Sequence, residues 1–524
     1  MNKQAGVGGA AANGAPPSEL AARDAEVARW PHSADAHFNR GNALRRLGHH
    51  SEALASYDTA LRLAPRDEQA LNNRGVVLRE LGRTTEALAS FEQALACRPD
   101  YPAALNNRGL ALQALGRNED ALAAFAHALT LQTDYTEALG NRAALLADLD
   151  RPEEALACYE RALALRPDDI VNLVNRGNVL QALKRHAEAL QSYGRALALD
   201  PDDAQAHWNE ALTRLALGDY RRGWAKYEWR WRNPALGMDA RLSDRPQWTG
   251  EPDIEGKTVL LHAEQGYGDA LQFIRYAPRV AALGARVIVA CAPQLRALFE
   301  GVEGVVQAFA PEVDPVPAFD LHIPLMSLPL AFGTMPETIP GSAPYLPPDA
   351  AGTQAWQARL APYQGRRIGL AWSGNPKFGR ARTKACPVAL MARLAAVPGC
   401  VFVSLQKGDA AAEGIQLRDA GANVLDYTDE LADFKATAAL VGALDLVISV
   451  DTAVAHLAGA LGKPVWILLP YAADWRWLVD RDDSPWYPSA RLFRQPQRGA
   501  WNAVIAKAEA ELARWTDAAA GAVS

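Results

Sequence analysis

Three loops in the carboxyl-terminal half of the chain carry side chains that could hold and transfer a charged group. The first loop, residues 264–269, ends in Gly268-Asp269 at the point where a helix is expected to begin. Glycine lets a ligand approach the backbone, and a carboxylate in such a loop can act as a general base. On residue type alone, capping of the helix is the more common role for an aspartate there. Catalysis and capping are therefore two open interpretations of Asp269.

The second loop combines small polar residues with a basic run. Ser373 and Gly374 follow an apolar strand, and four cations then occur within eight residues: Lys377, Arg380, Arg382 and Lys384. The segment 404–408 places Gln406 and Lys407 at the end of another strand. Because the whole chain is acidic, this local clustering is informative, and it would suit a diphosphate. A solvated charged loop is the alternative.

The third loop, residues 449–456, turns from an apolar strand into a helix of small residues. A helix N-terminus offers unpaired N–H groups and partial positive charge, both of which favour phosphate. Thr452 adds a hydroxyl beside Asp451, and His456 follows Thr452 by four residues, on the same helical face. A lone helical histidine is more often a packing residue, but the small neighbours of His456 leave room for it to face a cleft.

The elements that position these loops alternate between strand and helix. Short apolar runs predict strands at 257–262, 285–291, 305–309, 319–323, 367–372, 401–405, 444–450 and 465–469, and a final helix at 501–515. Such alternation predicts parallel sheets with right-handed crossovers, which bind ligands at the carboxyl ends of their strands. We expect two Rossmann-type α/β lobes, an amino lobe at 257–346 and a carboxyl lobe at 367–524, joined by a linker at 347–366.

The front half of the chain repeats itself every 34 residues. An asparagine marks the register in the first helix expected in each unit: Asn39, Asn73, Asn107, Asn141, Asn175 and Asn209. Small residues and one aromatic recur at the same step, and proline closes most units. The pattern resembles the tetratricopeptide repeat (TPR), which implies an all-α superhelix over 18–231, after a flexible tail (1–17) and before a connector (232–256).

The sixth unit differs from the others because aromatic residues crowd its second half: Trp224, Tyr227, Trp229 and Trp231. A terminal repeat normally turns a polar face outward. We therefore expect these aromatics to dock on the next domain; an ordinary hydrophobic cap is the alternative.

Taken together, the three loops resemble those of GT-B glycosyltransferases, specifically the heptosyltransferase-like lobes and, more loosely, protein O-GlcNAc transferases. The segment DTAVAHLAGALGKPVWIL, starting at Asp451, resembles the heptosyltransferase pattern (S/T)D(S/T)GxxHxAxAxxxP. This resemblance implies that a nucleotide-sugar is bound by Gly268, Ser373, Gly374, Lys384, Gln406, Lys407, Asp451, Thr452 and His456. It also implies catalytic roles for Asp269, as the base, and for His456. Ala453 stands where the family often has glycine, and Cys386 replaces the tryptophan of the family's Lys-x-Trp-Pro motif.

The recurring asparagines would form a row along the concave surface of stacked repeats. An amide both donates and accepts hydrogen bonds, so it can pair with peptide backbone of any sequence. The row resembles the asparagine ladder that grips acceptor polypeptide in protein O-GlcNAc transferases. Hydrogen bonds between repeats that only brace the stack are the alternative.

Composition and charge exclude several other classes. With 49% hydrophobic and 22% charged residues the chain is an ordinary globular sequence, and its net charge of -6 gives no basic excess for nucleic acid. The first 17 residues lack the apolar core of a signal peptide, and no stretch of about 18 apolar residues predicts a membrane span. Five scattered cysteines fit no metal knuckle or disulfide framework, so we expect a reducing cytoplasm.

These observations favour a cytoplasmic glycosyltransferase that holds a polypeptide acceptor on its TPR superhelix. We expect no metal and no cofactor, with the nucleotide-sugar as co-substrate. Two alternatives remain: a non-catalytic TPR scaffold with a degenerate transferase-like domain, and a transferase for lipid or polysaccharide glycans.

Overall fold

The computed structural model describes residues 17–237, 245–264, 266–341, 344–374, 384–419 and 421–520. The chain divides into two compact units, one ending at Asn209 and the other beginning at Glu210. Most of the expected tail, part of the connector and three cations of the basic run (Lys377, Arg380 and Arg382) lie outside the described residues.

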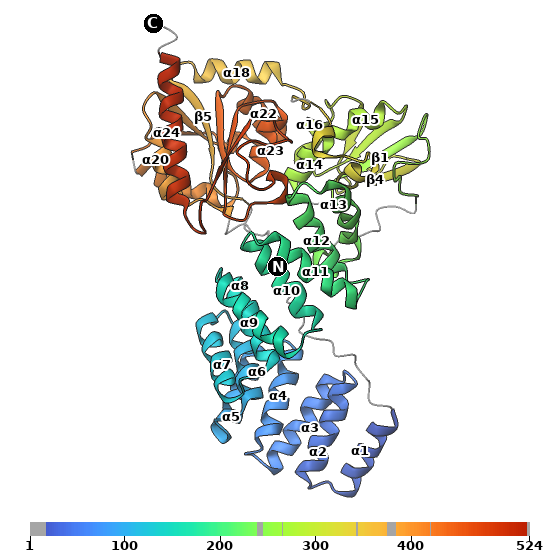
Figure 1. Ribbon diagram of the computed structural model, residues 1–524. Helices are drawn as coiled ribbons and strands as arrows, with labels where there is room; N and C mark the ends of the chain where they lie inside the picture. Colours follow the sequence, from blue (N-terminus) through green and yellow to red (C-terminus); the bar gives the residue numbers. More distant parts are fainter. Residues whose placement is uncertain are drawn as a thin grey trace. The chain divides into compact units, whose positions relative to one another are not determined.

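The first unit is a stack of helix pairs at the predicted 34-residue step (Figure 1). Its helices are α1 (Pro17–Arg29), α2 (Ala34–Arg46), α3 (His50–Leu63), α4 (Glu68–Glu80), α5 (Thr84–Cys97), α6 (Pro102–Ala114), α7 (Asn118–Leu131), α8 (Thr136–Asp148), α9 (Pro152–Leu165), α10 (Ile170–Ala182) and α11 (His186–Leu199). The boundary between the units falls within α12 (Ala204–Ala216). The all-α superhelix predicted from the repeats is confirmed.

Glycine and aromatic residues fix how closely the two helices of a repeat approach. A Cβ added to Gly75 on α4 would lie 2.5 Å from the Phe91 ring on α5, and one added to Gly109 would lie 2.5 Å from Phe125. Both rings are fully buried. The recurring glycine therefore provides the space that the recurring aromatic fills.

The amino lobe is a four-stranded parallel sheet of order β3-β2-β1-β4. Its strands are β1 (Thr258–His262), β2 (Arg286–Ala290), β3 (Val305–Phe309) and β4 (Leu321–Pro324). The helix expected from about Ala270 to Leu283 is divided into α14 (Tyr267–Phe273), a 3-10 turn η3 (Ile274–Tyr276) and α15 (Ala277–Ala281). Pro278 is the second residue of α15. Because proline has no backbone N–H, it cannot donate the hydrogen bond that would continue a regular helix through this point.

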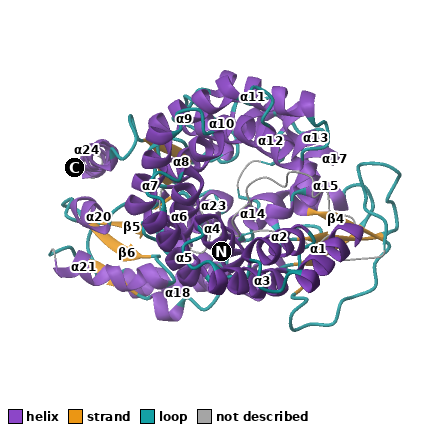
Figure 2. Cartoon of the chain, turned by 90° about the horizontal axis from the view of Figure 1, so that it is seen from below, coloured by secondary structure: helices purple, strands orange, loops and turns teal. Residues whose placement is uncertain are grey.

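The carboxyl lobe is a six-stranded parallel sheet of order β10-β9-β8-β5-β6-β7. Its strands are β5 (Arg366–Ala371), β6 (Cys400–Ser404), β7 (Val424–Asp426), β8 (Leu446–Val450), β9 (Val465–Leu469) and β10 (Ala490–Arg494). Its helices include α20 (Val388–Ala395), α21 (Gly414–Asp419), α22 (Phe434–Gly442), α23 (Ala453–Ala460) and α24 (Trp501–Ala520). In Figure 2 the strands β5 and β6 lie apart from β4, as expected for separate sheets. The predicted pair of parallel α/β lobes is confirmed.

The segment 347–366, expected to link the lobes, contains the helix α18 (Ala350–Leu360). Thr353 on this helix donates a hydrogen bond to the Ala439 carbonyl of α22 at 3.3 Å. The segment therefore packs on the carboxyl lobe. The strands β7 and β10, at the two edges of the sheet, were not predicted.

The aromatic segment after α12 is built into the α/β unit. It comprises α13 (Tyr220–Tyr227) and the 3-10 helix η1 (Glu228–Arg232). Trp224 Nε1 donates to the Thr334 carbonyl at 3.0 Å, and Trp486 Nε1 donates to the Tyr220 hydroxyl at 3.0 Å. Trp224 also packs edge-on against Trp475. The predicted docking is confirmed for Trp224, which touches both lobes.

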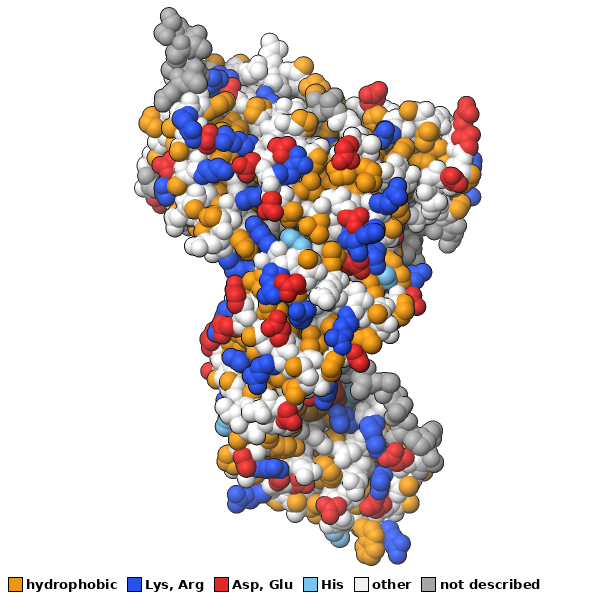
Figure 3. All heavy atoms as spheres, in the orientation of Figure 1, with side chains coloured by type: hydrophobic (Ala, Val, Ile, Leu, Met, Phe, Trp, Pro, Cys, Tyr) orange, Lys and Arg blue, Asp and Glu red, His pale blue; other side chains and the backbone are white. Residues whose placement is uncertain are grey.

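Charged side chains of both signs are interspersed over the described surface visible in Figure 3. No helix in the described ranges is long and apolar enough to cross a membrane.

Candidate functional site

The predicted loops of the two lobes meet at the carboxyl ends of both sheets. Strand β5 lies between β6 and β8, so the loops that follow these strands emerge side by side. A Cβ on Gly374 would lie 3.8 Å from the Thr452 methyl group. From the amino lobe, α14 packs on α23, and a Cβ on Gly268 would lie 2.8 Å from His456 Cδ2. Sequence positions nearly 200 residues apart therefore form one site.

Arg476 connects the predicted base to the carboxyl lobe. Its Nη2 pairs with Asp269 Oδ1, and its Nη1 donates to Asp474 Oδ1 at 2.8 Å. Its Nε donates to Gln272 Oε1 at 2.8 Å. Arg476 is 7% exposed and Gln272 is fully buried. Asp269 is thus held across the lobe interface by a cation, which capping of α14 alone would not require.

A second ion pair continues from this cluster. Lys384 Nζ lies 2.6 Å from Asp451 Oδ2 and 3.8 Å from Asp474 Oδ2. Asp451 Oδ1 lies 3.8 Å from His456 Nε2, and His456 Nδ1 lies 2.9 Å from the Tyr487 hydroxyl. The imidazole also stacks on the Trp477 ring. The carboxylates and cations therefore alternate from Asp269 to Asp451.

Burial changes the protonation of the groups in this cluster. Burial lowers the pKa of His456 to about 4, against the opposing effect of Asp451, so the imidazole is neutral at pH 7. Burial raises the pKa of Asp269, and the Arg476 guanidinium opposes that shift. Burial lowers the pKa of Lys384, but the charges of Asp451 and Asp474 together outweigh burial, so the pKa is raised. His456 can hydrogen-bond a ligand but carries no charge to attract one.

Gln406 and Lys407 lie at the end of β6 with different surroundings. Gln406 Oε1 accepts bonds from the Trp372 and Ser373 amides at 2.9 Å, and its Nε2 donates to two carbonyls. This buried amide is therefore saturated by backbone and braces the loop after β5. Lys407 Nζ donates to the Thr428 carbonyl at 2.5 Å. The structure places Gly268 against His456, pairs Lys384 with Asp451, and brings Asp451 near His456. Asp269 reaches this cluster through Arg476, and Gln406 positions Ser373.

The sequence interpretation missed Arg476, Asp474, Tyr487 and Gln272. A signal was present in the segment Asp474-Trp-Arg-Trp477, where two charges alternate with two tryptophans after a buried strand. The partners of Arg476 on the amino lobe lie more than 200 residues away in the sequence, so spacing could not reveal them.

A buried ion pair anchors the loop that leads to Asp269. Arg230 on η1 is fully buried and donates to both carboxylate oxygens of Glu264, at 2.7 and 3.0 Å. It also donates to Glu228 at 2.6 Å and to the Ser327 hydroxyl at 2.7 Å. The Glu264 side chain is 2% exposed. The segment α13–η1 therefore fixes the start of the loop whose end carries the predicted base.

Gly268→Ala is expected to disable the site. The new methyl group would clash with the His456 ring and push it away from Tyr487 and Asp451. Because misplacement of about 1 Å can cost about 100-fold in rate, we expect a comparable loss of kcat/KM for the reaction at this site. Gly266→Ala is the matched control, since a Cβ at Gly266 meets nothing within 4 Å. Equal activity of the two variants would contradict the placement of Gly268.

Stability should fall between pH 6.5 and pH 4. Burial also lowers the pKa of His262 to about 3, so both His262 and His456 stay neutral in the folded state while the unfolded chain takes up protons below pH 6.5. The protonation of unfolded His456 alone would remove about 3 kcal/mol from the free energy of unfolding by pH 4. Urea unfolding followed by tryptophan fluorescence measures this loss. His456→Gln should reduce the pH dependence and exposed His127→Gln should not; an unchanged slope in His456→Gln would refute the assignment.

Three of the six recurring asparagines bond to the neighbouring repeat. Across repeats, Asn73 donates to Asn42, Asn107 to Asn72 and Asn141 to Asn106, each at 2.9 Å. Asn209 accepts a bond from Gln205 at 3.0 Å. For Asn39 and Asn175, no side-chain bond is found to another described residue. Bracing therefore accounts for three members of the row.

Comparison with known proteins agrees with these two halves. Sequence models of the tetratricopeptide repeat match residues 20–68, 38–102, 100–168 and 134–202. The model of glycosyltransferase family 9 (heptosyltransferase) matches residues 416–497, which include Asp451, His456 and Arg476. The chain thus carries tetratricopeptide repeats in its amino-terminal half and a glycosyltransferase family 9 domain near its carboxyl end.

The chain is similar to Protein FlbA of Caulobacter vibrioides, with 31% identity over 327 residues. The match covers 58% of this chain and 54% of FlbA, so the chain spans about half the length of that relative. Among solved structures, it is similar to YrrB, a TPR protein with an unusual peptide-binding site (24% identity, TM-score 0.30, 36% of this chain and 96% of YrrB). It is also similar to a thermophilic TPR protein of Thermus thermophilus, with 25% identity and a TM-score of 0.31, over 35% of this chain and 100% of that protein. The similarity to pilF of Pseudomonas aeruginosa has 18% identity and a TM-score of 0.36, over 41% of this chain and 97% of pilF.

Proposed function

We propose that the unit beginning at Glu210 is a glycosyltransferase that moves a sugar from a nucleotide-sugar donor to an acceptor hydroxyl. One observation carries the proposal: at the carboxyl ends of both sheets, Gly268 of one parallel lobe lies against His456 of the other, and Asp269 pairs with Arg476 of that other lobe. Open α/β sheets bind ligands at this edge. The family 9 match over 416–497 supports the same assignment.

The donor diphosphate would bind at the N-terminus of α23. Thr452 occupies the N-cap position, and its hydroxyl makes no capping bond to the helix, so the amides of Ala453 and Val454 remain for a phosphate. Lys384, now paired with Asp451, supplies the adjacent cation. These groups would stabilise the negative charge of the leaving diphosphate without a metal.

Asp269 would accept the proton of the acceptor hydroxyl. At the same time the oxygen of that hydroxyl would bond to the anomeric carbon of the sugar, and the bond from this carbon to the diphosphate would break. Burial raises the pKa of Asp269, which makes the carboxylate a stronger base than an exposed aspartate. Arg476 engages Oδ1, and Oδ2 has no hydrogen-bond partner among the described residues. Oδ2 is therefore the oxygen suited to receive the proton.

Titration calorimetry with UDP, GDP and ADP in EDTA tests the donor site. We expect at least one nucleoside diphosphate to bind the wild-type chain, and Lys384→Met to weaken that binding at least tenfold through loss of a charge-assisted bond. Lys435→Met, on the exposed side of α22, is the matched control. The metal-free donor site would be refuted if no nucleotide bound, if binding required added Mg²⁺, or if the two lysine variants behaved alike.

For the acceptor, we propose a polypeptide held on the repeats by the asparagines that do not brace the stack. Asn39 and Asn175 are half-buried, so each amide keeps one side toward solvent. An amide in this position can pair with peptide backbone.

Asn175→Ala is expected to weaken acceptor binding several-fold without loss of stability, since its side chain bonds no described residue. Asn106→Ala removes the acceptor of the Asn141 amide and should instead lower the free energy of unfolding by about 1 kcal/mol. Retention of the acceptor polypeptide on the immobilised chain measures the effect on binding. Thermal unfolding measures the effect on stability. If Asn175→Ala bound the acceptor as well as the wild type, the recurring asparagines would only brace the stack of repeats.

A further inference from the structure

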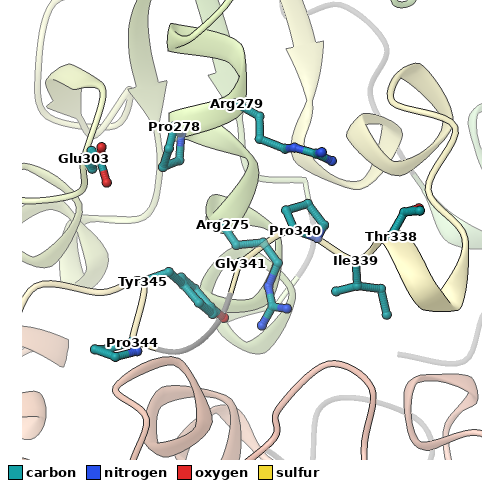
Figure 4. Close-up of a pocket in the computed structure, with 10 residues that line it drawn as sticks. All are labelled: Arg275, Pro278, Arg279, Glu303, Thr338, Ile339, Pro340, Gly341, Pro344 and Tyr345. Carbon is teal, nitrogen blue, oxygen red and sulfur yellow. The ribbon is translucent and has the colours of Figure 1, made fainter.

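A cavity of about 620 Å³ is lined by residues of the amino lobe, including Arg275 and Tyr345 (Figure 4). Its wall includes Glu303, which lies two residues before β3, and Arg279 of α15. The cavity is therefore near the amino ends of the strands, whereas the donor site lies at the carboxyl ends. Gln272 connects the two sites, because it bonds both Arg476 and Arg275.

Arg275 supplies a buried cation with unused bonding capacity. It is 3% exposed, its Nε donates to the Gln272 carbonyl at 3.0 Å, and its Nη2 donates to the Trp486 carbonyl at 2.9 Å. Its Nη1 has no hydrogen-bond partner among the described residues. Figure 4 shows the guanidinium in the cavity between Tyr345 and Ile339, and its carbon lies 4.4 Å from the Tyr345 ring centroid. A buried N–H group without a partner favours an external acceptor.

The other residues that line the cavity define the charge and shape of the ligand that could accept this hydrogen bond. Arg279 lies one helical turn after Arg275 and is exposed, with its guanidinium over the Phe332 ring. Glu303 is the one carboxylate that lines the cavity among the described residues, so two cations and one anion leave a net charge of +1. Pro278, Ile339 and Pro340 form apolar walls.

We propose that this cavity is a second ligand site, which binds a small carboxylate monoanion carried on an apolar stem. The carboxylate accepts from Arg275 Nη1 and approaches Arg279, and the stem lies on the prolines and Ile339. A single negative charge balances the net charge of the walls, whereas a nucleoside diphosphate carries too much charge for this cavity and binds at the donor site.

The test is benzoate binding to the full chain, measured by saturation-transfer NMR and calorimetry. Benzoate is expected to bind the wild-type chain, and exposed Arg279→Gln is expected to weaken binding about tenfold, as loss of a charge-assisted bond would. Ile339→Asp should abolish binding, because it places a second carboxylate on the apolar wall. Arg286→Gln, an exposed arginine of β2 outside the cavity, is the matched control and should bind as wild type.

Two further arms identify the ligand and the site. Inorganic phosphate should bind more weakly than benzoate, since it lacks the apolar stem, and UDP should not displace benzoate. The proposal is overturned if benzoate does not bind, if Arg279→Gln and Ile339→Asp bind it as well as Arg286→Gln, if phosphate binds more tightly, or if UDP competes with it.

Discussion

Asp269→Asn is expected to reduce sugar transfer about 1,000-fold while leaving the fold intact. The amide keeps the size of the carboxylate and can still accept from Arg476, which also retains Asp474. It cannot take the proton of an acceptor hydroxyl, and general-base catalysis is worth about 100- to 10,000-fold. Initial rates at saturating donor, together with a thermal unfolding curve, measure the two quantities.

The control for this prediction is Asp253→Asn, an exposed aspartate of the connector that precedes the same lobe, which should retain the wild-type rate. Nucleoside diphosphate binding by Asp269→Asn should also persist, because the donor phosphate groups are assigned to the other lobe. A near-normal rate in Asp269→Asn would show that the Asp269 carboxylate serves only to pair with Arg476.

Arg230→Met is expected to destabilise the α/β unit by about 3–5 kcal/mol. The substitution leaves Glu264 buried beside Glu228 without its cation, and breaking a buried ion pair from one side is costly. Since Glu264 begins the loop that ends at Asp269, the loss should also reduce sugar transfer at temperatures where the unit stays folded. Urea unfolding followed by tryptophan fluorescence reports the first effect.

A double variant separates the ion pair from packing. Arg230→Met with Glu264→Met removes both charges and should recover part of the lost stability. Arg232→Met, an exposed arginine on the same segment, is the control and should change stability little. If Arg230→Met were as stable as Arg232→Met, α13–η1 would not anchor the loop.

The periodic and apolar parts of the fold were predictable from the sequence. The 34-residue step located the repeats, and apolar runs located eight strands within about two residues of their observed bounds. The short edge strand β7 has only three residues, and the run at β10 carries two arginines, so neither gives an apolar signal. The step also placed the asparagines in a row, but a period cannot say whether an amide faces a ligand or the next repeat.

The candidate site was predictable where a motif carried it and not where the lobes meet. Asp451, His456 and Lys384 were found from loops within one lobe, and the structure places them in contact. Arg476 was missed because its role depends on Asp269 and Gln272, which only the packing of α14 on the carboxyl lobe brings near. Gln406 was found, but its saturation by backbone groups depends on loop geometry that residue type does not encode.

The most direct test of the central claim is release of nucleoside diphosphate from UDP-, GDP- and ADP-sugars by the purified chain in EDTA, with Asp269→Asn measured beside it. We predict that the wild-type chain turns over a sugar of the nucleotide that it binds and that Asp269→Asn releases none above background. Binding of a nucleotide without turnover of any of its sugars, with or without candidate acceptors, would contradict the account and favour a scaffold.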